Sequence, residues 1–139
     1  MFFDTKHVEA AYNLASAAHA LQTRIDGGAY IEHPERVCNL VGEESKVVAL
    51  LHDVLEDNPN ARLVASPGIS PYWKLCLGLD YVNLHTKEAE ALLILTRSKE
   101  ESYAEFIDRI CESENSIALD VKLADLEDNL CDLPEKLES

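Results

Sequence analysis

Basic residues are scarce in this sequence of 139 residues, where 12 lysines and arginines face 26 aspartates and glutamates, for a net charge of −14. Binding to nucleic acid or to an anionic membrane requires clustered lysine and arginine side chains, and here they are scattered singly. We therefore expect no nucleic-acid or membrane partner. A phosphorylated small molecule is compatible with this charge if a metal ion or a few placed arginines neutralise it locally.

Long hydrophobic runs are lacking as well, and we expect no leader sequence. Apolar stretches such as Val47–Leu51 are far shorter than the ~18 residues of a membrane span. The first residues carry Asp4, Lys6 and Glu9, which excludes the apolar core of a secretory signal. The four cysteines form no CxxC pair, and a chain of this length needs no disulfide for stability. We expect a cytoplasmic protein whose cysteines are small buried residues.

Helical spacing dominates the pattern of apolar residues, as in Val8, Ala11, Tyr12 and Ala15. It predicts helices over about 4–24, 34–42, 46–56, 71–79, 86–96, 99–113 and 115–130. Residues 59–85 are the hardest to interpret, and they could form a lid or a subunit contact. No stretch alternates convincingly with the period of a strand. The sequence therefore predicts an all-α fold, a compact multi-helix bundle that forms a single domain over residues 1–139.

The third predicted helix ends in a cluster of ionisable residues, His52-Asp53-Val54-Leu55-Glu56-Asp57. Spacings of three and four place these side chains on one helix face. Carboxylates at a helix C-terminus are unfavourable because of the helix dipole, and a bound cation would remove the repulsion. A solvated acidic helix end with an incidental histidine is the competing interpretation. The buried-type run Val47–Leu51 directly before the cluster favours a site.

Two other segments supply matching residues. Asp125 and Asn129 lie four apart on the last predicted helix, among apolar residues, where an aspartate needs a partner. Taken alone, Asp125 is as readily a capping or turn-forming residue. His33 precedes Pro34, which by itself indicates only the start of a helix.

Together these segments offer a mixed nitrogen and oxygen donor set without thiolates, namely His33, His52, Asp53 and Asp125. Such a set suits Mn, Fe(II), Co or Zn, with open positions for water and a phosphate oxygen. A bound ion of this kind lowers the pKa of water and polarises phosphorus. Glu56 and Asp57 are then the candidates for general acid and base.

At these residues the sequence resembles the HD-domain alarmone hydrolases, the hydrolase half of RelA/SpoT-type proteins and their small single-domain relatives. The resemblance spans about residues 8–130. It is carried by Ala17-Ala18-His19-x-x-Gln22-x-Arg24, Tyr30-Ile31-Glu32-His33-Pro34, Ala49-Leu50-Leu51-His52-Asp53-Val54-Leu55-Glu56-Asp57, Leu95-Thr96-Arg97, Tyr103, Arg109-Ile110 and Val121-Lys122-Leu123-Ala124-Asp125-Leu126-x-x-Asn129.

The resemblance implies an HD-domain bundle with one Mn ion and a phosphorylated nucleotide as substrate. In the family the reaction removes pyrophosphate from the 3′ position of ppGpp, and a metazoan relative instead acts as an NADPH phosphatase. The implied roles are metal binding for His33, His52, Asp53 and Asp125, activation of water and assistance of the leaving group for Glu56 and Asp57, contact with substrate phosphate or the catalytic carboxylates for Arg24, and contact with the nucleotide for Asn129.

Acidic departures from the family pattern favour a less charged substrate. Asp26 follows Arg24 closely, Asp128 and Leu126 stand where the family often has His and Arg, and Asp132 stands where it usually has Thr. Three interpretations therefore stay open: a hydrolase of ppGpp-like nucleotides, an HD hydrolase of NADPH or another phosphorylated nucleotide, and a non-catalytic nucleotide-binding regulatory module. Intact Glu56 and Asp57 argue against the third. A homo-oligomer is compatible with all of them.

Overall fold

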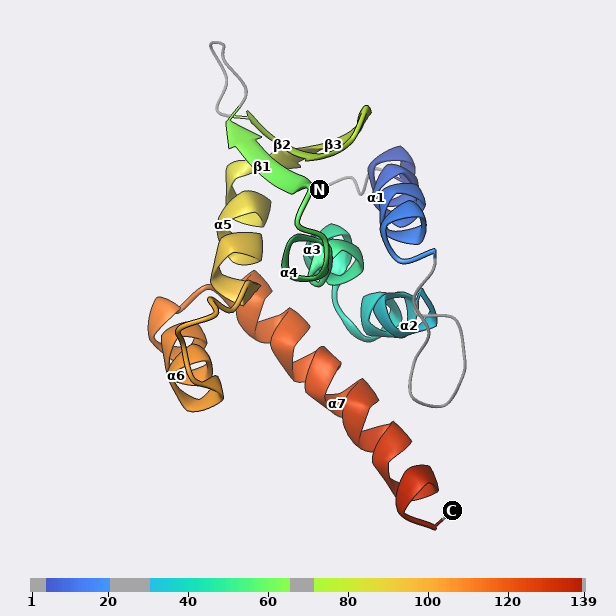
Figure 1. Cartoon of the computed structure of the whole chain (residues 1–139), viewed down its shortest axis with the longest axis vertical. Coiled ribbons are helices and arrows are strands. Elements are labelled where there is room, and N and C mark those ends of the chain that lie inside the picture. The colour runs from blue at the N-terminus through green and yellow to red at the C-terminus, as the bar shows by residue number, and fades with distance from the viewer. Residues whose placement is uncertain (1–4, 21–30, 66–71, 139) are drawn as a thin grey trace.

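A computed structural model describes residues 5–20, 31–65 and 72–138, with side chains over 6–20, 31–65 and 73–130 (Figure 1). The elements are α1 (Thr5–Ala18), α2 (Glu32–Leu40), the 3-10 turn η1 (Glu43–Ser45), α3 (Lys46–Leu51), α4 (Val54–Asp57), β1 (Ala61–Ala65), β2 (Tyr72–Leu77), β3 (Asp80–His85), α5 (Thr86–Leu95), α6 (Tyr103–Ser113) and α7 (Ser116–Glu138).

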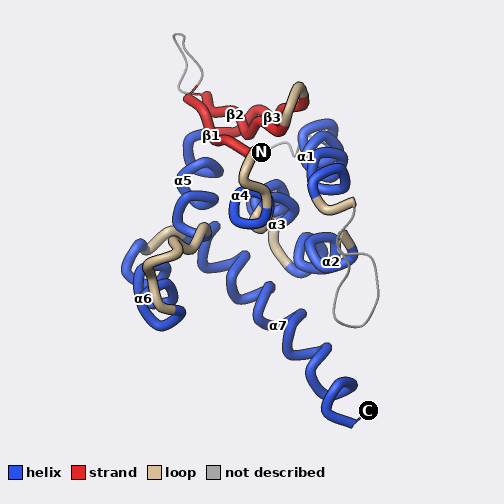
Figure 2. Tube along the Cα trace, viewed as in Figure 1, coloured by secondary structure: helices blue, strands red, loops and turns tan. Residues whose placement is uncertain are grey.

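The predicted all-α fold is wrong, because the molecule combines its helices with a three-stranded antiparallel sheet in the order β1-β2-β3. The sheet occupies the segment that was hardest to interpret and replaces the helix predicted over 71–79. In Figure 2 it forms a layer at one end of the helices. The fold is therefore mixed α and β, and residues 59–85 supply its sheet.

Pairing across strands explains why this segment forms a sheet. Leu75 lies opposite Leu63 on one side and Val82 on the other, so the three side chains form one row on one face. Leu75 and Val82 are almost completely buried against the helices. Only β3 alternates, with Val82 and Leu84 buried between exposed neighbours, whereas β1 and β2 are only partly buried. The stabilising rows exist only after the strands have paired.

A tight turn sets the register of β2 and β3. Leu77 pairs with Asp80, which leaves Gly78 and Leu79 as a two-residue loop. Gly78 has a φ of +63°, a conformation that glycine adopts without steric cost. Positive φ at the first loop residue alone is the pattern of a type II′ turn, whose twist suits a hairpin.

The core is centred on α3, the middle helix in Figure 1. All five residues of Val47–Leu51 are buried, and α3 packs against α1, α2, α5 and α7. A helix that is apolar on every side can be stable only when other elements surround it completely. This position places the end of α3, and therefore His52, inside the molecule next to α2 and α7.

Several helix bounds differ from the predicted ones. The helix predicted over 46–56 is interrupted at His52-Asp53 and continues as α4. In its described part, α1 ends at Ala18 rather than near residue 24. Helix α6 begins at Tyr103 because Ser102 and Glu105 form a reciprocal capping box. Helix α7 continues past Pro134 to Glu138, well beyond residue 130.

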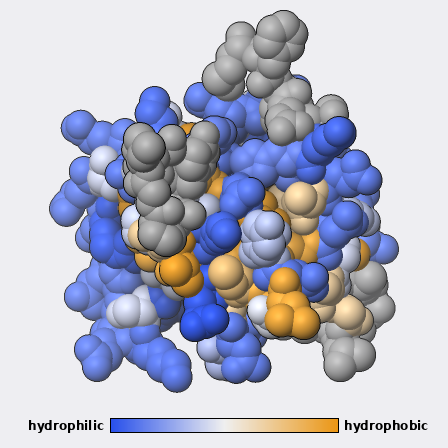
Figure 3. Space-filling view, turned by 90° about the horizontal axis from the view of Figure 1, so that it is seen from above, coloured by the Kyte–Doolittle hydropathy of each residue, from blue (hydrophilic) through white to orange (hydrophobic). Residues whose placement is uncertain are grey.

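The surface is mainly hydrophilic at the sheet end of the molecule, where hydrophobic side chains gather only in small patches (Figure 3). Val64, Leu79 and Tyr81 of this region are among the exposed large hydrophobic residues. Within the described ranges, none of the helices combines the length and the apolar character that crossing a membrane requires.

Candidate functional site

The interruption between α3 and α4 positions the first donor of the site. His52 follows the buried run of α3 and is itself only 6% exposed. Its Nδ1–H donates a 2.6 Å hydrogen bond to the main-chain oxygen of Ala49. This bond fixes the ring, so Nε2 faces Asp53 Oδ2 at 3.2 Å and Asp125 Oδ1 at 3.3 Å. The backbone thus orients the imidazole with its second nitrogen toward two carboxylates.

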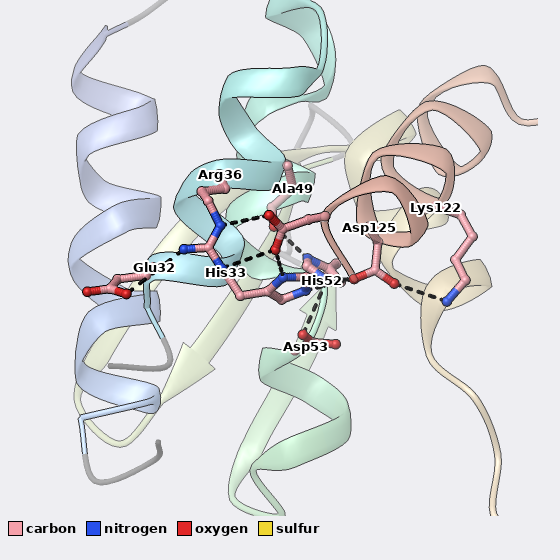
Figure 4. Close-up of polar contacts among 9 residues, drawn as sticks. Glu32, His33, Arg36, Ala49, His52, Asp53, Lys122 and Asp125 are labelled. Atoms are coloured by element: carbon pink, nitrogen blue, oxygen red, sulfur yellow. Dashed lines mark hydrogen bonds and ion pairs between the residues drawn. The ribbon is translucent and has the colours of Figure 1, made fainter. Parts of the chain in front are cut away.

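His33 approaches the same carboxylate from α2. Its Nε2 lies 2.7 Å from Asp125 Oδ1, and its ring packs edge-on against His52 (Figure 4). Donor atoms of His33, His52 and Asp125, all buried, lie within 4.8 Å of one another. Two metal–ligand bonds of about 2.1 Å span up to about 4.2 Å. Small side-chain movements would therefore allow one ion to contact this set.

Charge complementarity keeps the carboxylate of this cluster ionised. Burial alone would raise the pKa of Asp125, but hydrogen bonds from His33 and His52 outweigh it. The positive charge of Lys122, whose Nζ donates to Asp125 Oδ2 at 3.1 Å, acts in the same direction. The pKa of Asp125 therefore lies well below its usual range, and Asp125 presents an anionic oxygen.

The same negative charges raise the pKa of His52. Burial alone would lower the pKa of His52, but the charge of Asp53 and the hydrogen bonds to Asp125 and Asp53 outweigh it. The pKa of His52 consequently lies well above the usual histidine value in the metal-free chain. A cation is therefore favoured at this place, whether it is a proton or a metal ion.

A cleft of about 150 Å³ opens beside the cluster and contains Glu56. Partial burial, followed by the negative charges of Asp53 and Asp57, raises the pKa of Glu56. A carboxyl group with a raised pKa exchanges protons more readily near neutral pH. The cleft is lined by His52, Asp53, Glu56, Leu95, Arg97, Tyr103, Phe106, Val121, Lys122 and Asp125.

The structure thus brings His33, His52, Asp53 and Asp125 together, although their role as metal ligands stays a prediction. Asp57 ends α4 and is not among the residues that line the cleft. Asn129 is exposed on α7 and is also absent from this lining. Arg24 and Asp26 lie outside the described residues, as does the side chain of Asp132.

Sequence reasoning gave no structural role to two charged residues on the Nδ1 side of His33, Asp128 and Arg36. Asp128 is buried, and its Oδ2 accepts a 2.6 Å hydrogen bond from Nδ1–H of His33. Arg36 donates from Nε to Asp128 Oδ1 at 2.7 Å. Burial would raise the pKa of Asp128, but the hydrogen bonds from Arg36 and His33 lower it. The only available signal was spacing, since Arg36 and Asp128 each follow a candidate ligand by three residues.

Sequence reasoning also gave no role to the cations of the cleft. Lys122 and Arg97 both line it, beside the rings of Tyr103 and Phe106. Lys122 Nζ lies 5.5 Å and 5.3 Å from the centres of those two rings. Two cations and two aromatic rings next to the cluster can accommodate an anionic ligand with a planar group, despite the acidic composition of the chain.

A second group of donor atoms, from His7, His85 and Glu88, also lies within 4.8 Å. Other interactions account for it. His7 Nε2–H donates to the main-chain oxygen of Asn83 at 2.5 Å. His85 and Glu88 form the capping box at the start of α5. The cluster around Asp125 is therefore the stronger candidate for a metal site.

Comparison with known proteins relates part of this chain to RelA/SpoT-type enzymes, while no family model matches. It is 44% identical over 59 residues to the bifunctional (p)ppGpp synthase/hydrolase SpoT of Escherichia coli K12. The same values hold for a guanosine-3′,5′-bis(diphosphate) 3′-pyrophosphohydrolase of Escherichia coli O157:H7. Identity is 41% over 59 residues to the bifunctional (p)ppGpp synthase/hydrolase RelA of Mycobacterium tuberculosis. The match covers 39% of this chain and only 8% of each relative.

Proposed function

We propose that this chain is an HD-type phosphohydrolase that uses one divalent metal ion, most favourably Mn²⁺, to remove the 3′-pyrophosphate of ppGpp-like guanosine nucleotides. The convergence of His33, His52 and Asp125 from three parts of the chain carries this proposal. The relatedness to SpoT and RelA supports the substrate class, since those relatives are named for (p)ppGpp synthesis and hydrolysis.

The donor set fits a metal ion by its chemistry. Two imidazoles and two carboxylates without a thiolate suit Mn, Fe(II), Co or Zn. His52 already uses its Nδ1–H on a main-chain carbonyl, which leaves Nε2 for an ion. Asp53 Oδ2 lies 3.2 Å from that Nε2. When bound, the ion would supply a Lewis acid that polarises a phosphoryl group and lowers the pKa of water.

The residues of the cleft, together with Asp57 at the end of α4, account for the remaining chemistry of hydrolysis. Glu56 accepts a proton from the attacking water, whose oxygen forms the new bond to the phosphorus attached to the 3′ oxygen. The bond between that phosphorus and the 3′ oxygen breaks, and the leaving oxygen receives a proton with assistance from Asp57. Lys122 and Arg97 balance the negative charge of the phosphates, and the aromatic ring of Tyr103 can stack against the nucleobase. GDP and pyrophosphate are the products.

The position of Asp128 changes the case for a less charged substrate. In the sequence this residue is one of the acidic departures that favour a less charged substrate. In the structure it contacts His33 and Arg36 and does not line the cleft. One argument for NADPH over ppGpp is thereby removed, and both substrates belong in the same test.

The test is product analysis by anion-exchange chromatography after incubation with Mn²⁺ and ppGpp, NADPH, GTP or deoxynucleoside triphosphates. We expect ppGpp to be converted to GDP and pyrophosphate, and we expect no product after metal removal with a chelator. Asp120→Asn is the control. Asp120 accepts a hydrogen bond from the main-chain N–H of Gly42 and lies outside the cluster, so this variant should keep activity.

Three results would contradict the proposal. Turnover that survives a chelator would exclude the metal-dependent mechanism. Cleavage of NADPH without cleavage of ppGpp would show that the same site acts on a different substrate. Tight binding of a nucleotide without any cleavage would support the regulatory module instead.

A further inference from the structure

We propose that Asp128 is a positioning residue that holds the His33 ring in the tautomer and orientation that present Nε2 to the metal ion. The inference rests on the proposed function for the binding of an ion, whereas the contact between His33 and Asp128 is present without one.

The geometry pairs two carboxylates with the two nitrogens of one ring. Asp125 Oδ1 lies 2.7 Å from His33 Nε2, and Asp128 Oδ2 lies 2.6 Å from His33 Nδ1. The two aspartates are three residues apart on α7 and therefore project from the same helix face. Asp128 is 5% exposed and His33 is 3% exposed, so water hardly competes for these bonds.

Arg36 holds Asp128 in turn. Its Nε donates to Oδ1 at 2.7 Å and its Nη2 to Oδ2 at 3.3 Å, a contact at two points that fixes the plane of the carboxylate. Arg36 follows His33 by three residues on α2. The contacts between α2 and α7 thus involve two residues from each helix. His33 and Asp125 are the candidate ligands, and Arg36 and Asp128 support them.

A neutral imidazole carries one N–H, and the nitrogen without it has the lone pair that binds a metal. In the metal-free chain Nε2 faces Asp125 Oδ1 at 2.7 Å. When an ion takes that place, donation of Nδ1–H to Asp128 leaves the lone pair of Nε2 for the ion. His52 obtains the same orientation from the main-chain oxygen of Ala49, which no substitution removes. Asp128 is the counterpart for His33, and it can be tested by mutation. Loss of such an outer contact typically weakens metal binding by about 10–100-fold.

The first test uses protein loaded with diamagnetic Zn²⁺, where ¹⁵N NMR of the histidine side chains reports which nitrogen of His33 binds the ion and which carries the proton. Wild type should show the ion on Nε2 and the proton on Nδ1 of His33, and Asp128→Ala should show a mixture of ring orientations. Asp128→Asn keeps an oxygen that accepts Nδ1–H and should largely restore the wild-type tautomer. Arg36 retains Glu32 at 3.9 Å when Asp128 is replaced, so neither variant leaves it without an acidic neighbour.

The second test measures Mn²⁺ affinity from the electron paramagnetic resonance signal of free Mn²⁺. Asp128→Ala should raise the dissociation constant by about 10–100-fold, and Asp128→Asn by less. Asp120→Ala is the matched control. Asp120 lies on α7 and accepts the main-chain N–H of Gly42 just after α2, but it contacts no candidate ligand. It should change neither readout, although it also removes a contact between α7 and the segment after α2.

The positioning role is overturned if Asp128→Ala keeps both the Nδ1–H tautomer and the wild-type Mn²⁺ affinity. It is also overturned if Asp120→Ala weakens the metal as much, since the effect would then be structural. Failure of the proposed hydrolase gives a different result, namely wild-type protein that binds Mn²⁺ and loses affinity in Asp128→Ala, yet cleaves no nucleotide. Wild-type protein that binds neither Mn²⁺ nor Zn²⁺ overturns both proposals.

Discussion

Asp125 and Asp128 lie one turn apart on α7, yet their carboxylates have different surroundings. Asp125 shares the cleft with Lys122 and lies near both candidate histidines. Asp128 lies behind His33 and is held by Arg36. The side chains are chemically identical, so only the surrounding charges and the direction of approach separate a candidate ligand from a supporting residue.

Replacing Asp53 by alanine should remove most of the metal affinity. Asp53 lies 3.2 Å from His52 Nε2, and a site that loses a charged oxygen donor loses more than an outer-shell contact contributes, here more than about 100-fold. Isothermal titration with Mn²⁺ measures the effect. Wild-type affinity in this variant would show that Asp53 is not a ligand.

Replacing Glu56 by glutamine should leave the metal in place and reduce turnover by about 10²–10⁴-fold, because the amide cannot accept the proton of the attacking water. Mn²⁺ titration and the rate of pyrophosphate release are measured on the same preparation. Full turnover in Glu56→Gln would remove the assigned role, whereas loss of both metal and turnover would make Glu56 a ligand instead.

At the scale of elements, the hairpin and the broken third helix decide how the site is built. The β2–β3 hairpin covers the helices through the buried row that contains Leu75 and Val82. The helix breaks at His52-Asp53 and resumes as α4, and Asp53 and Glu56 border one cleft.

Replacing Gly78 by alanine should lower the free energy of unfolding by about 1 kcal/mol. The φ of +63° is unfavourable for alanine, although no atom lies within 4 Å of the added Cβ. Gly42→Ala is a matched control, since Gly42 also has open space but a φ of −70°, and it should not destabilise. Urea unfolding of both variants measures the difference. Equal effects would show that the turn conformation is not the cause.

At the scale of the whole molecule, an acidic chain assembles a candidate cation site from distant segments. The net charge of −14 would disfavour a phosphate ligand at most places on the surface. In the cleft, Lys122 and Arg97 lie beside the cluster that we propose to bind metal. Because the candidate ligands come from α2, the α3–α4 junction and α7, a bound ion would connect the parts of the core.

Metal should therefore stabilise the whole fold. An ion at 100 times its dissociation constant adds about 2.7 kcal/mol to the free energy of unfolding, which corresponds to a rise in melting temperature of roughly 10 °C for a chain of this size. Thermal melts with Mn²⁺ and with a chelator measure the shift. Asp53→Ala should show little of it. A similar shift in that variant would place the stabilising ion elsewhere.

The sequence by itself determined most helices and the clustering of His52, Asp53 and Glu56, because helical periodicity and the spacing of these three residues are local. It did not determine the sheet, since the row of Leu63, Leu75 and Val82 exists only once three strands have paired. Nor did it determine the contacts of Asp128 with His33 and Arg36. His33 and Asp128 are 95 positions apart, and only the packing of α2 against α7 brings their side chains into contact.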